Sequence, residues 1–272
     1  MIPDDDELPS AIAEARAFLE WESELGGIGY VRRERPVAAA RPPAGGGGRD
    51  VPAPASRATE STSFDPAAEK PRAPMIEGPR VTEPELSQRL RVLTDDAASC
   101  TECRLHTGRT KSVFSRGVPT ADLVFVGEGP GETEDLEGLP FVGEAGKLLD
   151  KMIAAMGYGR DDVYICNVVK CRPPKNRTPE PDEARSCSRF LTGQIELVRP
   201  RAIVSLGRCA AEGLGVMPPD GRNWRGAWTS YRGIPVMPTY HPAYLLRSPE
   251  QKRVVWEDLQ KVMARLGQRS VK

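Results

Sequence analysis

The sequence lacks any apolar run long enough to span a bilayer, and it lacks a net charge. Its 272 residues include 38 Lys and Arg against 38 Asp and Glu, and 39% of them are hydrophobic. A transmembrane helix needs about 20 consecutive apolar residues, so we expect no membrane association. The acidic start, MIPDDDELPS, also lacks the basic and apolar regions of a secretory signal. These absences predict a soluble protein in the reducing cytoplasm.

Large apolar residues are also scarce between residues 35 and 80, where Pro, Ala, Gly and Arg dominate. Such a segment buries too little surface to offset the entropy of ordering it, which predicts a flexible linker over residues 31–85. Residues 1–30 are different, because Leu8, Ile12, Ala15 and Leu19 recur at helical spacing after an acidic start. We expect an amphipathic helix there that packs on the main domain or docks on a protein partner.

Residues 86–272 alternate short apolar runs with amphipathic stretches. The strand-like runs are 123–126, 163–169, 202–206 and 234–238, and the helical stretches lie near 145–157, 181–198, 208–214 and 249–266. This alternation predicts an α/β domain of three layers, α/β/α, around a central four-stranded parallel sheet. Because ligands bind beyond the carboxyl ends of such strands, the residues that follow each strand are the candidate site.

Cysteine usage points to a metal site. Disulfides are rare in the cytoplasm, so six cysteines there indicate metal binding or catalysis more than a disulfide framework. Cys100 and Cys103 form a C-x-x-C pair, and Cys171 and Cys187 follow with fifteen residues between them. Four thiolates can hold an iron–sulfur cluster or a tetrahedral zinc, and the spacing alone does not separate the two. Cys166 and Cys209 are expected to be small buried residues.

Unusual residues follow three of the predicted strands. Gly127–Asp135 is rich in glycine, as in a dinucleotide site, but its carboxylates would repel a pyrophosphate and no helix is expected to start there. The segment therefore predicts a tight backbone around a small planar group. Asn167 can read the edge of a base, and the basic stretch after it suits phosphates. His241 precedes an apolar loop that ends in Arg247 and could wedge into DNA.

The segments GEGPGETED, PFVG, NVVKCRPPKNR and HPAYLLR, with the four cysteines, resemble the family 4 uracil-DNA glycosylases over residues 87–266. The resemblance implies a DNA-repair enzyme that hydrolyses the N-glycosidic bond of deoxyuridine, releases uracil and leaves an abasic site. It implies a [4Fe–4S] cluster held by Cys100, Cys103, Cys171 and Cys187. We expect a monomer that acts in the cytoplasm, at the nucleoid, on uracil-containing DNA, single or double stranded.

The resemblance also implies a role for individual residues. Phe141 would stack on uracil, Asn167 would read its edge, Glu134 would exclude the thymine methyl group, and Gly129 would help enclose the base. His241 and Glu128 would be catalytic, with Asn176 as a helper. The expected DNA contacts are Lys170, Arg172, Lys175, Arg177, Leu245, Leu246 and Arg247, the last three as a wedge.

Two departures and two alternatives accompany this interpretation. Leu139 and Glu144 stand where the family often has basic residues, so phosphate contact from this loop is expected to be weaker. Gly129 replaces the Gln of a related branch that becomes trapped on uracil, so ordinary turnover is expected. The alternatives are a non-catalytic, metal-stapled DNA-binding protein and a small-molecule α/β enzyme that uses the acidic loop.

Overall fold

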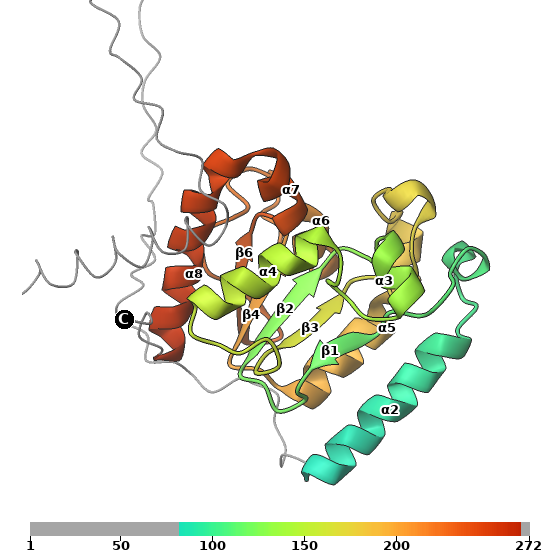
Figure 1. The fold of residues 1–272 in the computed structure, drawn as a ribbon. Coiled ribbons are helices and arrows are strands. Elements are labelled where there is room, and N and C mark those ends of the chain that lie inside the picture. The colour runs from blue at the N-terminus through green and yellow to red at the C-terminus, as the bar shows by residue number, and fades with distance from the viewer. Residues whose placement is uncertain (1–81, 268–272) are drawn as a thin grey trace, which may run out of the picture. The chain divides into compact units, whose positions relative to one another are not determined.

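A six-stranded mixed sheet forms the centre of the protein in the computed structural model, which describes residues 82–267 (Figure 1). The strands lie in the order β1-β3-β2-β4-β6-β5. The four inner strands are parallel, and β1 and β5 pair antiparallel at the two edges. The bounds are β1 Ser115–Gly117, β2 Leu123–Gly127, β3 Tyr164–Asn167, β4 Ala202–Leu206, β5 Thr229–Tyr231 and β6 Ile234–Thr239.

The predicted four-stranded parallel sheet is therefore only the inner part of the observed sheet. Strands β2, β3 and β4 are buried along their whole length, which explains their continuous apolar sequences. The edge strands β1 and β5 are three residues long and carry polar residues. Neither contains an apolar run, so the pattern that identified the inner strands did not predict either of them.

Helices cover both faces of the sheet, as the three-layer prediction requires. They are α2 Glu83–Ser99, α3 Glu132–Glu137, α4 Glu144–Ala155, α5 Pro181–Val198, α6 Arg208–Gly213, α7 Pro242–Arg247 and α8 Lys252–Leu266. Alternate residues of β2 face opposite layers: Val124 packs in one core with α2, α5 and α6, and Phe125 packs in the other with α4 and α8. Short 3₁₀ turns complete the fold at η1 Arg104–Thr107, η2 Pro174–Asn176 and η3 Pro249–Gln251.

Several predicted boundaries need correction. Helix α2 begins at Glu83, so the end of the predicted linker at residue 85 is wrong. The helix itself was not predicted, because only three of its residues, Leu86, Leu90 and Ala97, are buried and its apolar pattern is therefore sparse. Helix α8 begins at Lys252 because a 3₁₀ turn precedes it. The predicted helix in residues 1–30 and the linker up to residue 81 lie outside the described residues.

Two segments expected to be loops are short helices. Gly131 caps α3, so the Gly-rich turn does open a helix, contrary to the prediction. His241 caps α7, which contains the whole Pro-Ala-Tyr-Leu-Leu-Arg sequence. Neither helix exceeds six residues, which is too short for a helical period to be visible in the sequence. Within residues 82–267, no helix is both long and apolar enough to cross a bilayer.

Candidate active site

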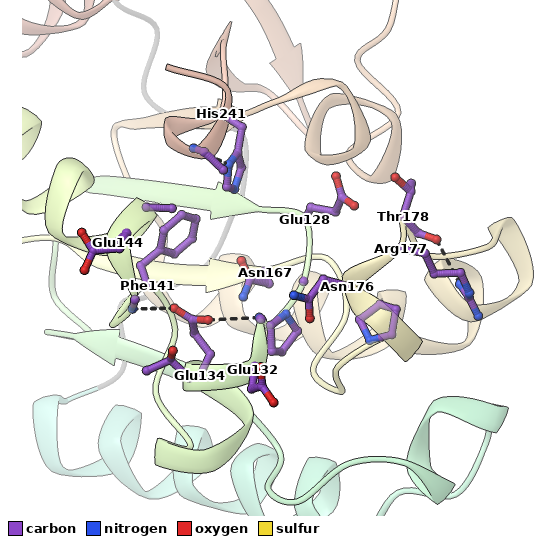
Figure 2. A pocket seen from close by; sticks show the side chains of 18 of the residues that line it. Glu128, Glu132, Glu134, Phe141, Glu144, Asn167, Asn176, Arg177, Thr178 and His241 are labelled. Carbon is purple, nitrogen blue, oxygen red and sulfur yellow. Dashed lines mark hydrogen bonds between the residues drawn. The ribbon is translucent and has the colours of Figure 1, made fainter. Parts of the chain in front are cut away.

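A pocket of about 550 Å³ opens at the carboxyl ends of the inner strands (Figure 2). Its walls come from the segments that follow β2, β3 and β6, as expected for an open parallel sheet. Every residue predicted to be catalytic or to bind the base lines this one pocket. The predicted site residues found there are Glu128, Gly129, Glu134, Phe141, Asn167, Asn176, Arg177, His241 and Arg247.

Phe141 forms one wall of the pocket beside His241. Its backbone has a left-handed φ of 56°, and its ring lies 5.5 Å from the His241 ring with 29° between the planes. Gly127 makes this packing possible, because a Cβ there would lie 2.5 Å from the Phe141 ring and 2.4 Å from Asn167 Oδ1. Gly127 therefore brings an aromatic ring and an amide within reach of one small planar ligand.

Asn167 ends β3 with a buried polar atom that has no partner. The residue is 2% exposed, and its Oδ1 accepts no hydrogen bond from any described residue. A buried polar group without a partner costs about 1–3 kcal/mol. Because Asn167 lines the pocket, this oxygen is the acceptor that the residue can offer to an N–H group of a ligand.

His241 is held as a neutral donor. The Ala243 N–H donates to its Nδ1 at 3.1 Å, so the proton of the neutral ring must sit on Nε2. Burial lowers the pKa of His241 to about 4, and the Arg247 charge adds to the decrease. The ring is thus uncharged at neutral pH, and Nε2–H is its one hydrogen-bond donor.

Glu134 orders the loop that carries Phe141. Its carboxylate accepts from three backbone N–H groups, of Gly131 at 3.1 Å, Val142 at 3.0 Å and Gly143 at 2.8 Å. These bonds tie the start of α3 to the backbone just after Phe141. Glu134 therefore fixes the shape of the pocket, besides any contact it makes with a ligand.

Glu128 follows β2 and points a half-buried carboxylate at the pocket (Figure 2). Burial raises the pKa of Glu128 above its ordinary value, the nearby Glu212 charge adds to the increase, and a hydrogen bond with the Thr178 side chain opposes it. A carboxylate with restricted hydration beside a neutral imidazole suits the binding of a water molecule or of developing positive charge.

Comparison with known proteins gives the family. The sequence model of the Uracil DNA glycosylase superfamily matches residues 114–260, more than half of the chain. This chain belongs to the uracil-DNA glycosylase superfamily. The matched segment contains every residue that the sequence predicted to be catalytic or to bind the base.

Curated relatives place this superfamily member in the type-4 branch. The type-4 uracil-DNA glycosylase of Thermotoga maritima is 46% identical over 182 residues, which cover 63% of this chain and 92% of that protein. The type-4 enzyme of Sulfurisphaera tokodaii is 44% identical over 64% of this chain and 83% of its own length. That of Saccharolobus solfataricus is 42% identical over 67% of this chain and 88% of its own length.

Two of the expected DNA contacts of this superfamily member are buried. Lys170 is 1% exposed and donates through Nζ to Asn167 O and Gln194 Oε1, each at 2.6 Å. Leu245 is 0% exposed, because α7 turns it into the core beside α4 and α8. Neither side chain is accessible to DNA in this conformation, so both predictions are corrected. By contrast, Leu246 is 49% exposed on the outer face of α7, and Arg247 is exposed.

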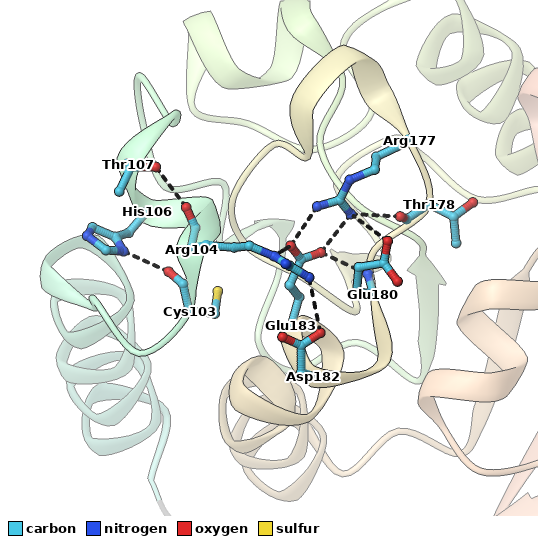
Figure 3. A network of polar contacts seen from close by, with 9 residues as sticks. All are labelled: Cys103, Arg104, His106, Thr107, Arg177, Thr178, Glu180, Asp182 and Glu183. Carbon is cyan, nitrogen blue, oxygen red and sulfur yellow. Dashed lines mark hydrogen bonds and ion pairs between the residues drawn. The ribbon is translucent and has the colours of Figure 1, made fainter.

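Arg177 was also expected to contact DNA, but its guanidinium is bound within the protein (Figure 3). It forms two hydrogen bonds with the buried Glu183, at 2.8 and 2.7 Å, and Arg104 Nε donates to the same carboxylate at 2.7 Å. The bond from Arg177 lowers the pKa of Glu183 to about 2. This network joins η1, the β3–α5 loop and α5. Sequence reasoning missed it, although the Pro-Asp-Glu start of α5 marks a helix N-terminus.

The other basic residues of this loop remain at the surface. Lys175 is exposed, and Arg172 donates from Nε to Asn176 Oδ1 at 2.8 Å. Lys175 and Asn176 both have a left-handed φ of 56°, which turns the chain sharply at the rim of the pocket. Arg172 therefore holds the side chain of Asn176, the predicted catalytic helper, in place.

The four predicted metal ligands, Cys100, Cys103, Cys171 and Cys187, line one small cavity. Three of their sulfurs accept from N–H groups: Cys187 from Lys170 N at 3.3 Å, Cys171 from Arg109 Nη1 at 3.2 Å and Cys100 from Arg189 Nη2 at 3.6 Å. Such donors stabilise thiolates, so this set fits an anionic, sulfur-ligated group. Within residues 82–267, no three His, Cys, Asp or Glu side chains converge on a single-ion position.

The two remaining cysteines differ from each other. Cys166 is fully buried, as expected. Cys209 is only half-buried and lies near Glu128 and Glu212; burial and then these two charges raise the pKa of its thiol to about 12. It borders a second cavity beside the active site.

Proposed function

We propose that this chain is a DNA-repair glycosylase that hydrolyses the N-glycosidic bond of deoxyuridine in DNA, releasing uracil and leaving an abasic site. One observation carries the proposal: the unpartnered Asn167 Oδ1 and the neutral His241 lie in one pocket beside the Phe141 ring. Membership of the uracil-DNA glycosylase superfamily supports it independently. DNA in the cytoplasm, at the nucleoid, is the proposed place of action.

Asn167 would select uracil by its hydrogen-bonding edge. Its Oδ1 accepts from the uracil N3–H, and its Nδ2 donates to O4. Cytosine presents an acceptor at N3 and a donor at N4, so it would leave buried polar groups unpaired at about 1–3 kcal/mol each. The Glu134 side chain, fixed by its three backbone bonds, would exclude the thymine methyl group by shape.

His241 would act on the departing uracil, and Glu128 would act on the water that attacks the sugar. When the C1′–N1 bond breaks, its electron pair stays on the uracil, and negative charge develops at O2. His241 Nε2–H donates to that oxygen, and a preorganised donor of this kind contributes about 3–4 kcal/mol. Glu128 orients the water whose oxygen bonds to C1′ and takes its proton, which passes to the departing uracil through solvent. Asn176 lies at the rim and would help hold that water.

Extrusion of the base would depend on α7. Leu246 and Arg247 are exposed at the end of this helix, six residues or fewer from His241 at its N-cap. An apolar side chain in the vacated stack offsets part of the few kcal/mol that base flipping costs. Arg247, Arg172 and Lys175 would meet the flanking phosphates. Arg177 is committed to Glu183 and would act on DNA only by shaping the loop.

Cys100, Cys103, Cys171 and Cys187 would hold a [4Fe–4S] cluster. Their common cavity and the N–H donors to three of the sulfurs support this assignment. When bound, the cluster would supply a structural cross-link. It would tie the segment before η1 to the β3–α5 loop, which carries Asn176 at the pocket rim.

The alternative of a non-catalytic DNA-binding protein is not favoured, because it gives no role to Glu128, Asn167 and His241 in one pocket. A strand-cleavage assay tests the proposal. Oligonucleotides with a single uracil, and matched ones with thymine, are incubated with the full chain and then treated with alkali. We expect cleavage at uracil only. Intact uracil strands after alkali would contradict the proposal.

A further inference from the structure

A second cavity of about 280 Å³ adjoins the active-site pocket. It shares Glu128, Thr178, His241 and Tyr244 with that pocket, so both spaces open on the same catalytic groups. Trp224 and Tyr240 join the shared Tyr244 as its aromatic wall, and Gly207, Arg208, Cys209 and Glu212 complete the lining. Release of uracil gives this second cavity no role.

The aromatic walls form one contiguous cluster. The Tyr240 and Tyr244 ring centroids are 5.0 Å apart, and the Trp224 and Tyr240 centroids are 5.9 Å apart in an edge-to-face arrangement. All three residues are partly exposed. Aromatic rings left open beside a nucleic-acid site are platforms on which unpaired bases stack.

The segment that carries Trp224 is held firmly against the domain. Arg225 Nη1 donates to the buried Asp258 at 3.1 Å, and its guanidinium lies 4.8 Å from the Tyr240 ring centroid. Gly226 N donates to Pro238 O at 2.9 Å, and Lys261 Nζ donates to Gly226 O at 2.7 Å. The residues directly after Trp224 are thus fixed before any ligand binds, so a stacking partner meets a preorganised ring.

We infer that this cavity takes the base of a nucleotide next to the uracil, stacked against Trp224 and Tyr240, in single-stranded DNA. The inference rests on the proposed function and extends it to the strand context. A base suits the cavity better than a phosphate, because its aromatic wall offers stacking faces and the Glu128 carboxylate borders it. Arg208, the one cation among the described residues that line the cavity, is already paired with Glu212 at 3.0 Å. In a duplex the neighbouring base stays paired and stacked, so the site acts on single strands.

The test is a double-mutant cycle between Trp224→Ala and the neighbouring base. Single strands carry one uracil whose 5′ or 3′ neighbour is either a normal nucleotide or an abasic tetrahydrofuran spacer. We expect the spacer on one side to lower kcat/KM of the wild type about tenfold, the usual scale of one base–aromatic stack. The Trp224→Ala variant should be slower on the normal strand and indifferent to the spacer, and Trp224→Phe should restore part of the dependence.

Tyr231→Ala is the matched control, because Tyr231 is a partly exposed aromatic residue of β5 outside both cavities. It should keep the wild-type response to the spacer. Equal spacer effects in the wild type and Trp224→Ala, or no effect on either side in the wild type, would overturn the inference.

A binding assay separates this inference from the proposed function. Fluorescence anisotropy with single strands containing 2′-fluoro-2′-deoxyuridine, whose glycosidic bond resists hydrolysis, measures the same cycle without turnover. A wild type that releases no uracil but shows the coupling in binding would overturn the function and support the stacking site. Release of uracil without coupling in either assay would support the proposed function and overturn the stacking site.

Discussion

The Nζ atom of Lys170 donates to the backbone oxygen of Asn167 at 2.6 Å, inside the protein. The same ammonium reaches Gln194 Oε1 at 2.6 Å, and Gln194 Nε2 donates in turn to Phe114 O at 3.0 Å and Tyr164 Oη at 3.1 Å. A buried polar network therefore supports the backbone of the residue that would read uracil. Since Lys170 precedes Cys171, the network also borders the cysteine cavity.

Lys170→Met should disturb Asn167 without touching a ligand. The change leaves two buried oxygens without a donor, at about 1–3 kcal/mol each. We expect a lower free energy of unfolding, measured in urea. We also expect kcat/KM for uracil-containing strands to fall by a larger factor than the affinity for DNA. Lys170→Arg should recover part of the activity. Lys147→Met, at an exposed lysine of α4 that does not line the pocket, is the control, and a Lys170→Met protein with wild-type stability and activity would exclude the positioning role.

Asn167→Leu should separate function from stability. The substitution removes the unpartnered buried Oδ1 and keeps the branched shape of the side chain, so the free energy of unfolding should stay level or rise by about 1 kcal/mol. Uracil release should fall by about 100-fold, because the base loses two hydrogen bonds in a buried pocket. Urea denaturation and single-turnover rates measure the two effects. Wild-type release by a stably folded variant would show that Asn167 does not read the base.

The pH dependence of uracil release should follow Glu128 and not His241. Burial raises the pKa of Glu128, so kcat/KM should fall with decreasing pH at a value above the 4.5 of an ordinary glutamate, as the carboxylate takes up a proton. The pKa of His241 is about 4, so no limb is expected near the ordinary value of 6.5. Glu128→Gln should be slow and lack the acid limb. A limb near 6.5 that disappears in His241→Asn would contradict the neutral histidine.

Glu183 should stabilise the fold most at neutral pH. Its folded-state pKa is about 2, below the value of 4.5 in the unfolded chain. A depressed carboxylate pKa gives stability that is present above 4.5 and is lost as the pH falls through 2. The difference in unfolding free energy between the wild type and Glu183→Gln should therefore shrink on acidification. The exposed neighbour Asp182→Asn serves as the control, and a difference that does not change with pH would refute the assignment.

The cysteine site should carry iron. We expect the purified protein to show broad visible absorption and about four iron and four inorganic sulfide atoms per chain, as a [4Fe–4S] cluster requires. The Cys171→Ser variant should lose the visible absorption and have a lower thermal midpoint. The Cys209→Ser variant should keep the absorption and the wild-type thermal midpoint. One zinc per chain and no visible absorption would contradict the cluster and indicate a tetrahedral zinc site, which the cysteine spacing also allows.

The inner strands and the pocket residues were predictable because each strand is a continuous apolar run and the site follows the strands. Burial within short helices was not predictable, since Leu245 and Leu246 are adjacent in sequence and only the turn of α7 decides which of them is exposed. Long-range pairs were equally hidden. Lys170 belongs to a basic stretch, but Gln194, 24 residues later, binds it in the interior, and Glu183 likewise binds the guanidinium of Arg177.

Release of free uracil is the decisive test of glycosylase activity. A single-stranded oligonucleotide with one radiolabelled uracil is incubated with the full chain, with His241→Asn and with Glu128→Gln, and the released base is separated by chromatography. We expect free uracil and an intact abasic strand from the wild type, with release by each variant reduced at least about 100-fold. A wild type that binds the strand but releases no uracil, or variants that match its rate, would contradict this expectation.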